Sequence, residues 1–192
     1  MDTSVSSSAF QRISLKTPLK HSVVRTLRAG DRVLLSGVLY TARDAAHQRM
    51  IQTLEKGGSL PFDPFEQTLY YVGPAPTRPG AIIGPAGPTS SYRMDRFTPI
   101  LLQQGLSAMI GKGKRSLEVV EAIKKYGALY FGAVGGAAAL IAASIRKASV
   151  VAYEDLGPEA VHRLEVIDFP LVVLIDSLGN NLYESEPPKY RQ

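Results

Sequence analysis

The segment from Gly84 to Asp95 (GPAGPTSSYRMD) combines residue types that suit anion binding. Glycines and prolines hold the backbone in a turn, three consecutive hydroxyl residues follow, and Arg93 comes soon after. Apolar spacing predicts a helix over Met94–Gln104, so this turn would present unpaired N–H groups at the positive end of a helix dipole. Arg93 would add a planar guanidinium that matches a carboxylate or phosphate. The alternative is a plain N-cap.

Arg43 and His47 lie in a second segment of interest, TARDAAH, directly after a predicted strand. Sites in α/β folds favour the carboxyl end of a strand. A cation in the first turn of a helix opposes the dipole, so Arg43 requires an anion, either a ligand or Asp44. His47 lies one turn further on the same side. The alternatives are an exposed ion pair for Arg43 and an ordinary packed or solvated histidine.

Lys112 stands between two glycines, which let the backbone approach a ligand closely, and its ammonium can act as a point charge on a carboxylate. The alternative is a solvated turn lysine, and the GKGK segment lacks the spacing of a Walker A loop. Thr89 becomes a useful base only if nearby cations lower the pKa of its hydroxyl. Arg93 and Lys112 would do so if the fold brings them together.

Strand and helix patterns alternate along the chain and predict an α/β or mixed single domain with a layered core. The predicted strands are Arg32–Leu39, Thr68–Val72, Ala81–Ile83, Ser107–Ile110, Ala128–Phe131, Ala148–Tyr153 and Leu171–Asp176. The predicted helices run from a cap at Thr41 or Asp44 to about Lys56, over Met94–Gln104, over Ser116–Tyr126 with Ser116 as cap, and over Gly135–Ile145. We expect residues 1–14 to form a flexible segment that leads into an edge strand, 15–185 the domain and 186–192 a tail.

Composition narrows the function classes. The 192 residues carry a net charge of +5, spread along the chain, which suits an anionic substrate or an acidic partner and argues weakly for nucleic acid. With no cysteine and three widely spaced histidines, we expect neither a disulfide, nor a cysteine-ligated cluster, nor a zinc site on this chain.

The apolar run Ala128–Ile145 contains three glycines and predicts a strand, a turn and a buried helix rather than a membrane span. We expect a cytoplasmic protein, since no apolar signal core begins the chain.

Eight motifs in order resemble the β subunit of the class I fumarase and L(+)-tartrate dehydratase family, the iron–sulfur-dependent hydro-lyases. They are LKTPL (15–19), LRAGDRVLLSGVLYTARDAAH (27–47), LPFD (60–63), YYVGPAPTRPG (70–80), GPAGPTSSYRMD (84–95), MIGKGKRS (109–116), GGAAAL (135–140) and YEDLGPEAV (153–161). The resemblance implies a layered β/β/α swivelling-domain fold. It also implies a [4Fe–4S] cluster held by three cysteines of an α subunit, with one iron open to substrate. This chain would bind neither cofactor nor metal, and it would be active only in αβ pairs that form a symmetric hetero-oligomer.

The resemblance also implies roles for individual residues. Arg43, Arg93 and Lys112 would bind the carboxylates of a small dicarboxylate, and Thr89 would be the candidate base. Ser90 would support Thr89 through the turn and belong to the substrate-binding set. His47 matches the family's ARDxAH pattern and would be a further substrate-binding residue. The chain departs from the family pattern at two positions. Ser90 stands where the family usually has a second threonine, and Tyr92 stands where a small residue is common.

Fumarate hydratase is the function we expect, with L(+)-tartrate dehydratase as the alternative in the same chemistry. A non-catalytic anion-binding or assembly module is the alternative from another class. Retention of Arg43, Thr89, Arg93 and Lys112 argues against that module.

Overall fold

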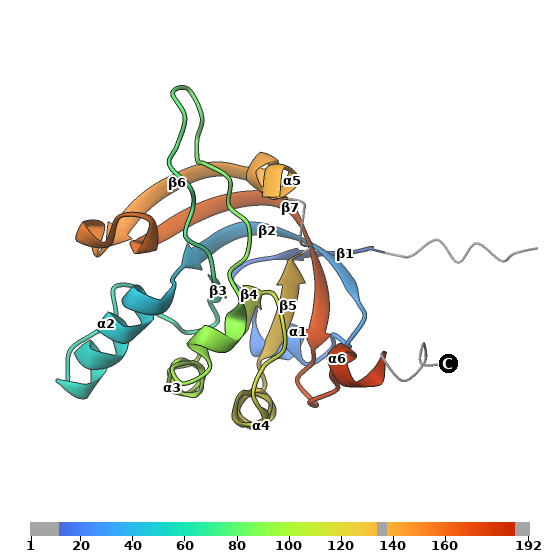
Figure 1. Cartoon of the computed structure of the whole chain (residues 1–192). Coiled ribbons are helices and arrows are strands. Elements are labelled where there is room, and N and C mark those ends of the chain that lie inside the picture. The colour runs from blue at the N-terminus through green and yellow to red at the C-terminus, as the bar shows by residue number, and fades with distance from the viewer. Residues whose placement is uncertain (1–11, 134–137, 187–192) are drawn as a thin grey trace, which may run out of the picture.

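The computed structural model of the chain describes residues 12–133 and 138–186. A single sheet organises these residues (Figure 1). Its strands are β1 (Arg12–Lys16), β2 (Arg32–Thr41), β3 (Thr68–Tyr70), β4 (Ala108–Gly111), β5 (Leu129–Ala133), β6 (Ile145–Ala152) and β7 (Val161–Ile175). Their order is β1-β2-β3-β4-β5-β7-β6, and β2 also pairs with β7.

The sheet closes on itself through β2. One edge of β2 pairs in parallel with β1 and, further along, with β3, while the other edge pairs antiparallel with β7. Since β7 also pairs with β5, the strands β2, β3, β4, β5 and β7 form a closed ring. The register of β2 against β7 shifts near Gly37, whose φ is 114°. A Cβ at Gly37 would overlap the hydroxyl of Thr17, so only glycine fits this bend.

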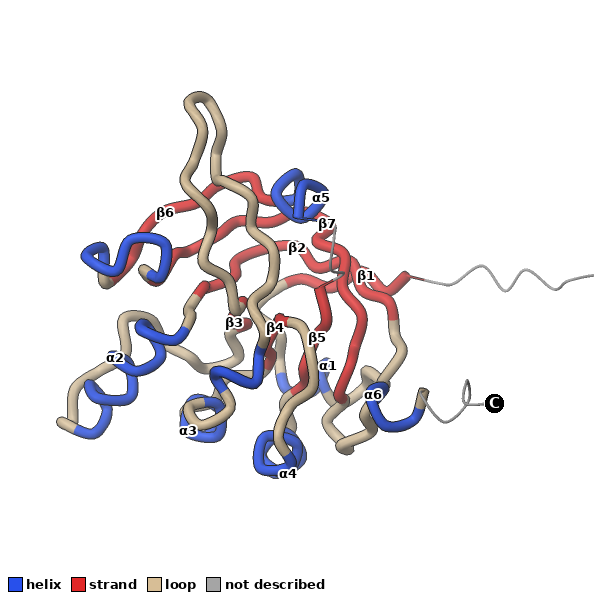
Figure 2. Tube along the Cα trace, in the orientation of Figure 1, coloured by secondary structure: helices blue, strands red, loops and turns tan. Residues whose placement is uncertain are grey.

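Three helices cover one side of the sheet: α2 (Asp44–Glu55), α3 (Thr98–Gln103) and α4 (Leu117–Tyr126). Figure 2 shows them below the strands, with α5 (Ala138–Ser144) on the opposite side near β6. The short elements are α1 (His21–Val24), α6 (Leu182–Ser185) and the 3-10 helices η1 (Ser91–Met94) and η2 (Glu154–Glu159). The elements β2-α2-β3, β3-α3-β4 and β4-α4-β5 each return to a parallel neighbour, as α/β units do.

Two apolar cores hold these layers together, and the strands alternate between them. On β4, Ala108 and Ile110 join the core enclosed by the ring of strands, whereas Met109 joins the core beneath the helices. The same alternation on β5 sends Phe131 inward and Tyr130 toward α4. A strand buried on both faces explains why β4 and β5 are apolar throughout.

Most predicted elements are confirmed, with shifted ends. The mixed α/β class in one domain is confirmed, as are the strands at β2, β3, β4, β5 and β6 and the helix α4. Ser116 caps α4, because its hydroxyl accepts the N–H of Val119 at 3.4 Å. The edge strand expected near the start is β1, although it begins within the segment predicted to be flexible; residues 1–11 and 187–192 lie outside the described residues. The strand predicted from Leu171 begins ten residues earlier in the sequence, at Val161.

Two predictions between β3 and α3 are wrong. Residues 81–83 form no strand; they belong to a long loop that projects beyond β6 (Figure 1). The two legs of this loop contact each other, with the Ala75 N–H donating to the Pro85 carbonyl at 3.0 Å. The single helix predicted over Met94–Gln104 is divided into η1 and α3, because Pro99 cannot donate a backbone hydrogen bond within a continuous helix.

The apolar run Ala128–Ile145 contains strand β5 and helix α5, as expected, although the turn between them lies outside the described residues. Among the described residues, we find no helix with the length and apolar character that crossing a membrane requires.

Candidate functional site

The predicted site residues gather where three parallel strands end. In the register, Thr41 of β2 faces Tyr70 of β3, and Tyr70 faces Ile110 of β4. Arg43 and Lys112 each follow two residues after these positions, so they leave the same edge of the sheet. Neighbouring strands are about 4.8 Å apart. Because β3 lies between β2 and β4, the backbones of Arg43 and Lys112 are about 10 Å apart. Parallel topology thus brings together residues that are far apart in the sequence.

The hydroxyl turn lies across the ends of β3 and β4. The Thr89 N–H donates to the Tyr71 carbonyl at 2.7 Å, and the Ser91 N–H donates to the Lys112 carbonyl at 2.9 Å. Ser90 and Lys112 form a parallel bridge. The structure therefore joins Thr89, Ser90 and Lys112. The N–H groups of residues 89 and 91 have carbonyl partners, so these two are not among the unpaired N–H groups expected of the turn. Ser90 makes no side-chain cap bond to η1.

Ser91 anchors this turn in the interior, a role that the sequence analysis did not assign. Its side chain is fully buried, and its Oγ accepts hydrogen bonds from the Lys112 N–H at 3.2 Å and the Tyr130 hydroxyl at 2.9 Å. A Cβ at Gly111 would overlap the Ser91 hydroxyl, so this glycine permits the close approach of the two segments. Burial raises the pKa of Tyr130 and keeps its hydroxyl protonated as a donor.

Arg115 connects the elements beneath the turn. Its side chain has no exposed surface; its Nε donates to Asp95 at 2.7 Å and its Nη2 donates to Thr98 at 2.7 Å. The guanidinium lies 5.3 and 4.9 Å from the ring centroids of Tyr71 and Tyr130. Burial alone would lower the pKa of Arg115, but Tyr71, Asp95 and Tyr130 outweigh burial and raise it. Arg115 therefore stays charged and links η1 and α3 to β3 and β5.

Arg43 and Arg93 share one carboxylate. Arg93 Nε lies 2.9 Å from Asp44 Oδ1, and Arg43 Nε lies 3.7 Å from Asp44 Oδ2. Glu159 from η2 lies on the other side, with Oε1 3.5 Å from Arg43 Nη2 and Oε2 accepting the Ala45 N–H at 2.9 Å. Arg43 itself is the N-cap residue of α2, and neither expected cap, Thr41 nor Asp44, holds that position. A distant carboxylate thus caps α2 and offsets the cation at its first turn.

His47 lies in the core beneath Arg43. Its ring is completely buried between Tyr71 and Phe97, and Nδ1 bonds the Arg43 carbonyl at 2.8 Å. Burial lowers the pKa of His47 to about 4, so the ring is neutral at pH 7 and Nδ1 is the donor. The position of His47 agrees with the alternative of an ordinary packed histidine. A fully buried ring has no surface with which to contact a substrate.

The remaining predicted side chains are unpaired. The Thr89 and Ser90 hydroxyls and the Lys112 ammonium have no hydrogen-bond or ion-pair partner within residues 12–133 and 138–186. Thr89 and Ser90 are half-buried, whereas Lys112 is exposed. Tyr92 is 68% exposed at the rim, so its bulk extends into solvent in this chain.

Asp44, Glu159 and Arg115 are the functional candidates that sequence reasoning missed. Asp44 was considered only as a counter-ion of Arg43, and its second partner, Arg93, is 49 residues away in the sequence. Glu159 and Arg115 lie within the family-like segments YEDLGPEAV and MIGKGKRS. Their position within these motifs is the sequence signal from which both residues could have been predicted as part of the site.

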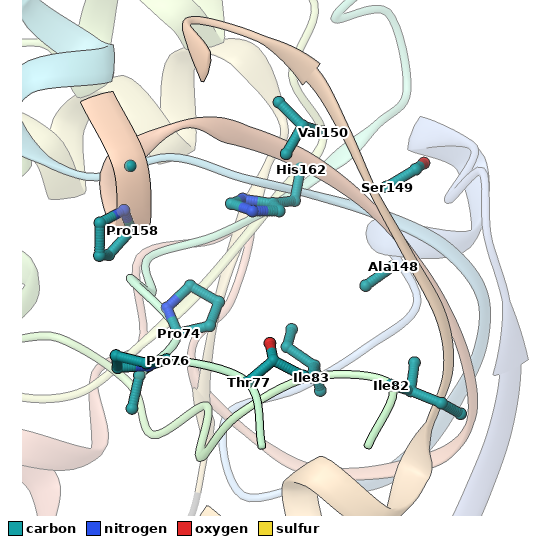
Figure 3. A pocket seen from close by; sticks show the side chains of 12 residues that line it. Pro74, Pro76, Thr77, Ile82, Ile83, Ala148, Ser149, Val150, Pro158 and His162 are labelled. Carbon is teal, nitrogen blue, oxygen red and sulfur yellow. The ribbon is translucent and has the colours of Figure 1, made fainter. Parts of the chain in front are cut away.

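A hollow beside the site is not the anion site. The hollow in Figure 3 lies between the projecting loop and β6. Its lining includes Pro74, Thr77, Ile83, Val150 and His162. None of the six predicted site residues contributes to its wall, and its lining carries neither lysine nor arginine. The predicted residues instead form an open edge.

The site has no ligand set for an iron–sulfur cluster. The chain has no cysteine, and the described residues include no cluster of three or more histidine, aspartate or glutamate side chains that could hold a metal ion. What the edge does offer is two arginines, a lysine and two hydroxyls, the donor set for a small carboxylate.

Comparison with known proteins identifies the class. The family model described as the fumarase C-terminus matches residues 2–186. The chain is 38% identical over 176 residues to fumarate hydratase 2 of Leishmania major and 37% over 177 residues to the aerobic class I fumarate hydratase of Escherichia coli K12; both alignments cover 90% of this chain. It is 40% identical over 167 residues to a putative L(+)-tartrate dehydratase subunit beta of Methanocaldococcus jannaschii, covering 84% of this chain and 86% of that protein.

The chain therefore belongs to the fumarase C-terminus family. It spans about a third of the length of the fumarate hydratases that it matches, 31% and 32% in the two cases.

Proposed function

We propose that this chain is the β subunit of a hydro-lyase that interconverts L-malate and fumarate. The observation that carries the proposal is the convergence of Arg43, Arg93, Lys112 and the Thr89–Ser90 turn at one edge of the sheet. Three cations from separate loops suit a dianion, and orientation of such a substrate supplies a large part of the barrier reduction.

Dehydration removes a weakly acidic C–H proton and breaks a C–O bond, so that the substrate hydroxyl leaves as hydroxide. The family's [4Fe–4S] cluster, when bound, would supply the Lewis acid that takes up this hydroxide. The Thr89 Oγ1 is the candidate base; it would receive the proton as an alkoxide, a form that the neighbouring Lys112 cation favours. Arg43, Arg93 and Lys112 would hold the carboxylates and spread the negative charge that develops on carbon. Ser90 would keep Thr89 in place through the turn that bridges to Lys112.

We infer that the [4Fe–4S] cluster of the family belongs to a cysteine-bearing α subunit, since this chain has no cysteine to hold it. The open edge of the site supports this division, because a partner would be needed to enclose a substrate. In the proposal the present domain swivels over the partner, and αβ pairs form a symmetric hetero-oligomer.

L(+)-Tartrate dehydratase is the second candidate. The relative named as its β subunit has nearly the length of this chain, with 86% of that protein aligned, whereas the matched fumarate hydratases are about three times as long. The same cations and hydroxyls suit tartrate, which is also a 2-hydroxy dicarboxylate.

Anaerobic co-expression with a candidate α subunit, followed by cluster reconstitution, tests the proposal. Fumarate absorbance is followed with malate as substrate, and oxaloacetate is followed with L-tartrate. Turnover of malate supports fumarate hydratase, and turnover of tartrate alone supports the second candidate. A stable complex that acts on neither would contradict both and favour a non-catalytic module.

A further inference from the structure

We infer that Asp44 is a positioning residue that orients Arg43 and Arg93 for a dicarboxylate. The inference rests on the proposed function and concerns the same edge of the sheet. Asp44 lies at the first position of α2, and its two oxygens face different arginines, Oδ1 toward Arg93 at 2.9 Å and Oδ2 toward Arg43 at 3.7 Å. One carboxylate therefore determines how far apart the two guanidiniums stand.

Without this carboxylate, the two arginines have unequal support. Arg43 is 23% exposed and keeps a second carboxylate, Glu159, at 3.5 Å. Arg93 is 42% exposed, and Asp44 is its one ion-pair partner within the described residues. Like charges that share a counter-ion repel when it is removed, and a long exposed side chain then loses conformational order. Arg93 would be the side chain that moves.

The bridge between Asp44 and Arg43 is a charge contact without a hydrogen bond. Arg43 Nε and Asp44 Oδ2 are both buried, yet neither has a hydrogen-bond partner in the part of the chain that the structure describes. Their separation of 3.7 Å is beyond hydrogen-bond length. The Asp44 carboxylate therefore orients the Arg43 guanidinium through charge and does not use up its N–H donors.

Removal of Asp44 has two opposing effects that can be separated by measurement. The local charge becomes more positive, which favours any anion. The lost orientation penalises a ligand that must engage the arginines and Lys112 at once. Succinate, an unreactive dicarboxylate, requires both anchors, whereas propionate requires one. Charge alone would leave the preference for succinate unchanged or raise it, because succinate is a dianion and propionate a monoanion. A fall in that preference therefore reports lost orientation.

The experiment uses the assembled αβ complex and compares Asp44→Asn with Asp155→Asn. Asp155 is a matched control, because it pairs with Arg49 at 2.7 Å on the surface and contacts neither site arginine. For Asp44→Asn we expect the preference for succinate over propionate to fall about tenfold, and KM for malate to rise more than kcat falls. Asp155→Asn should leave both unchanged. An unaltered preference in Asp44→Asn, including tighter binding of both ligands in parallel, would overturn the inference.

Two further results keep the test decisive. If Asp44→Asn fails to assemble, Asp44→Glu retains the charge and moves the carboxylate by one methylene; a severalfold loss of preference supports positioning, and a wild-type preference overturns it. Binding requires no turnover, so a wild-type complex that binds succinate but converts neither malate nor tartrate would refute the proposed function while the Asp44 comparison still decides the inference. A wild-type complex that binds no succinate overturns the Asp44 inference, and malate turnover then decides the proposed function separately.

Discussion

The two halves of the candidate site are held in different ways. In the arginine half, Arg43 and Arg93 are paired with Asp44 and Glu159, so charge is balanced by side chains. In the hydroxyl–lysine half, Thr89, Ser90 and Lys112 are positioned by backbone hydrogen bonds, and their functional groups are unpaired among the described residues. The difference indicates that side-chain carboxylates orient the two arginines, whereas backbone hydrogen bonds place the hydroxyls and the lysine.

The largest expected effect lies in the hydroxyl–lysine half. Thr89→Val retains the shape of the side chain and the backbone bond to Tyr71, but removes the candidate base. We expect kcat of the complex to fall about 10³-fold, with KM changed severalfold at most. Single-turnover kinetics with malate separate the two quantities, and Ser90→Ala serves as the control with a smaller loss. Equal losses in substrate binding and turnover would make Thr89 a binding residue.

Removing one cation from each half tests the comparison directly. Arg93→Met and Lys112→Met should each reduce kcat/KM by about 10²-fold, because each leaves a substrate carboxylate less well paired. Their effects on stability should differ: Arg93→Met leaves Asp44 with a weaker partner and lowers the free energy of unfolding by up to about 1 kcal/mol, whereas Lys112→Met leaves it unchanged. Equal changes in Tm for the two variants would argue against the distinction.

Gly73→Ala disturbs the arginine half without altering any charge. A Cβ at this position would lie 2.7 Å from Arg43 Cδ and 2.9 Å from Arg43 Nη1, so the Arg43 side chain must move. We expect KM for the dicarboxylate to rise about tenfold, with kcat less affected. A double-mutant cycle with Arg43→Met provides the check. If Gly73→Ala costs as much in the Arg43→Met background, its effect does not pass through Arg43.

A pH dependence of stability is expected beneath the arginine half, and it concerns folding rather than catalysis. Burial lowers the pKa of His47 from 6.5 to about 4, so the unfolded chain binds a proton between these values that the folded chain does not. His47 should therefore reduce the free energy of unfolding as pH falls from about 6.5 to about 4, by up to about 3 kcal/mol. Urea unfolding of wild type and His47→Asn at several pH values measures the difference. Parallel pH profiles for the two proteins would contradict this account.

Local patterns predicted the elements whose signals are complete within a few residues. Ser116 precedes an amphipathic run, and it caps α4. The prediction of one helix over Met94–Gln104 was wrong because its apolar spacing runs past the point where a new helix must begin. Pro99 is accepted only in the first turn of α3, so the chain breaks between Met94 and Thr98. The first ten residues of β7 were missed because its burial depends on pairing with β2 and β6 at once, which no short window contains.

By itself, the sequence determined which chemistry is available here: the residue types that bind carboxylates, no cysteine to hold a cluster, and motifs sufficient to indicate the family. Only the tertiary structure decided which of these residues meet. Parallel strands brought Arg43 and Lys112 to one edge, Ser91 tied Thr89 beside Lys112, and Asp44 joined two arginines 50 residues apart. It also placed His47 in the core. Such contacts depend on strand register and burial, which are set by the whole chain and not by neighbours in sequence.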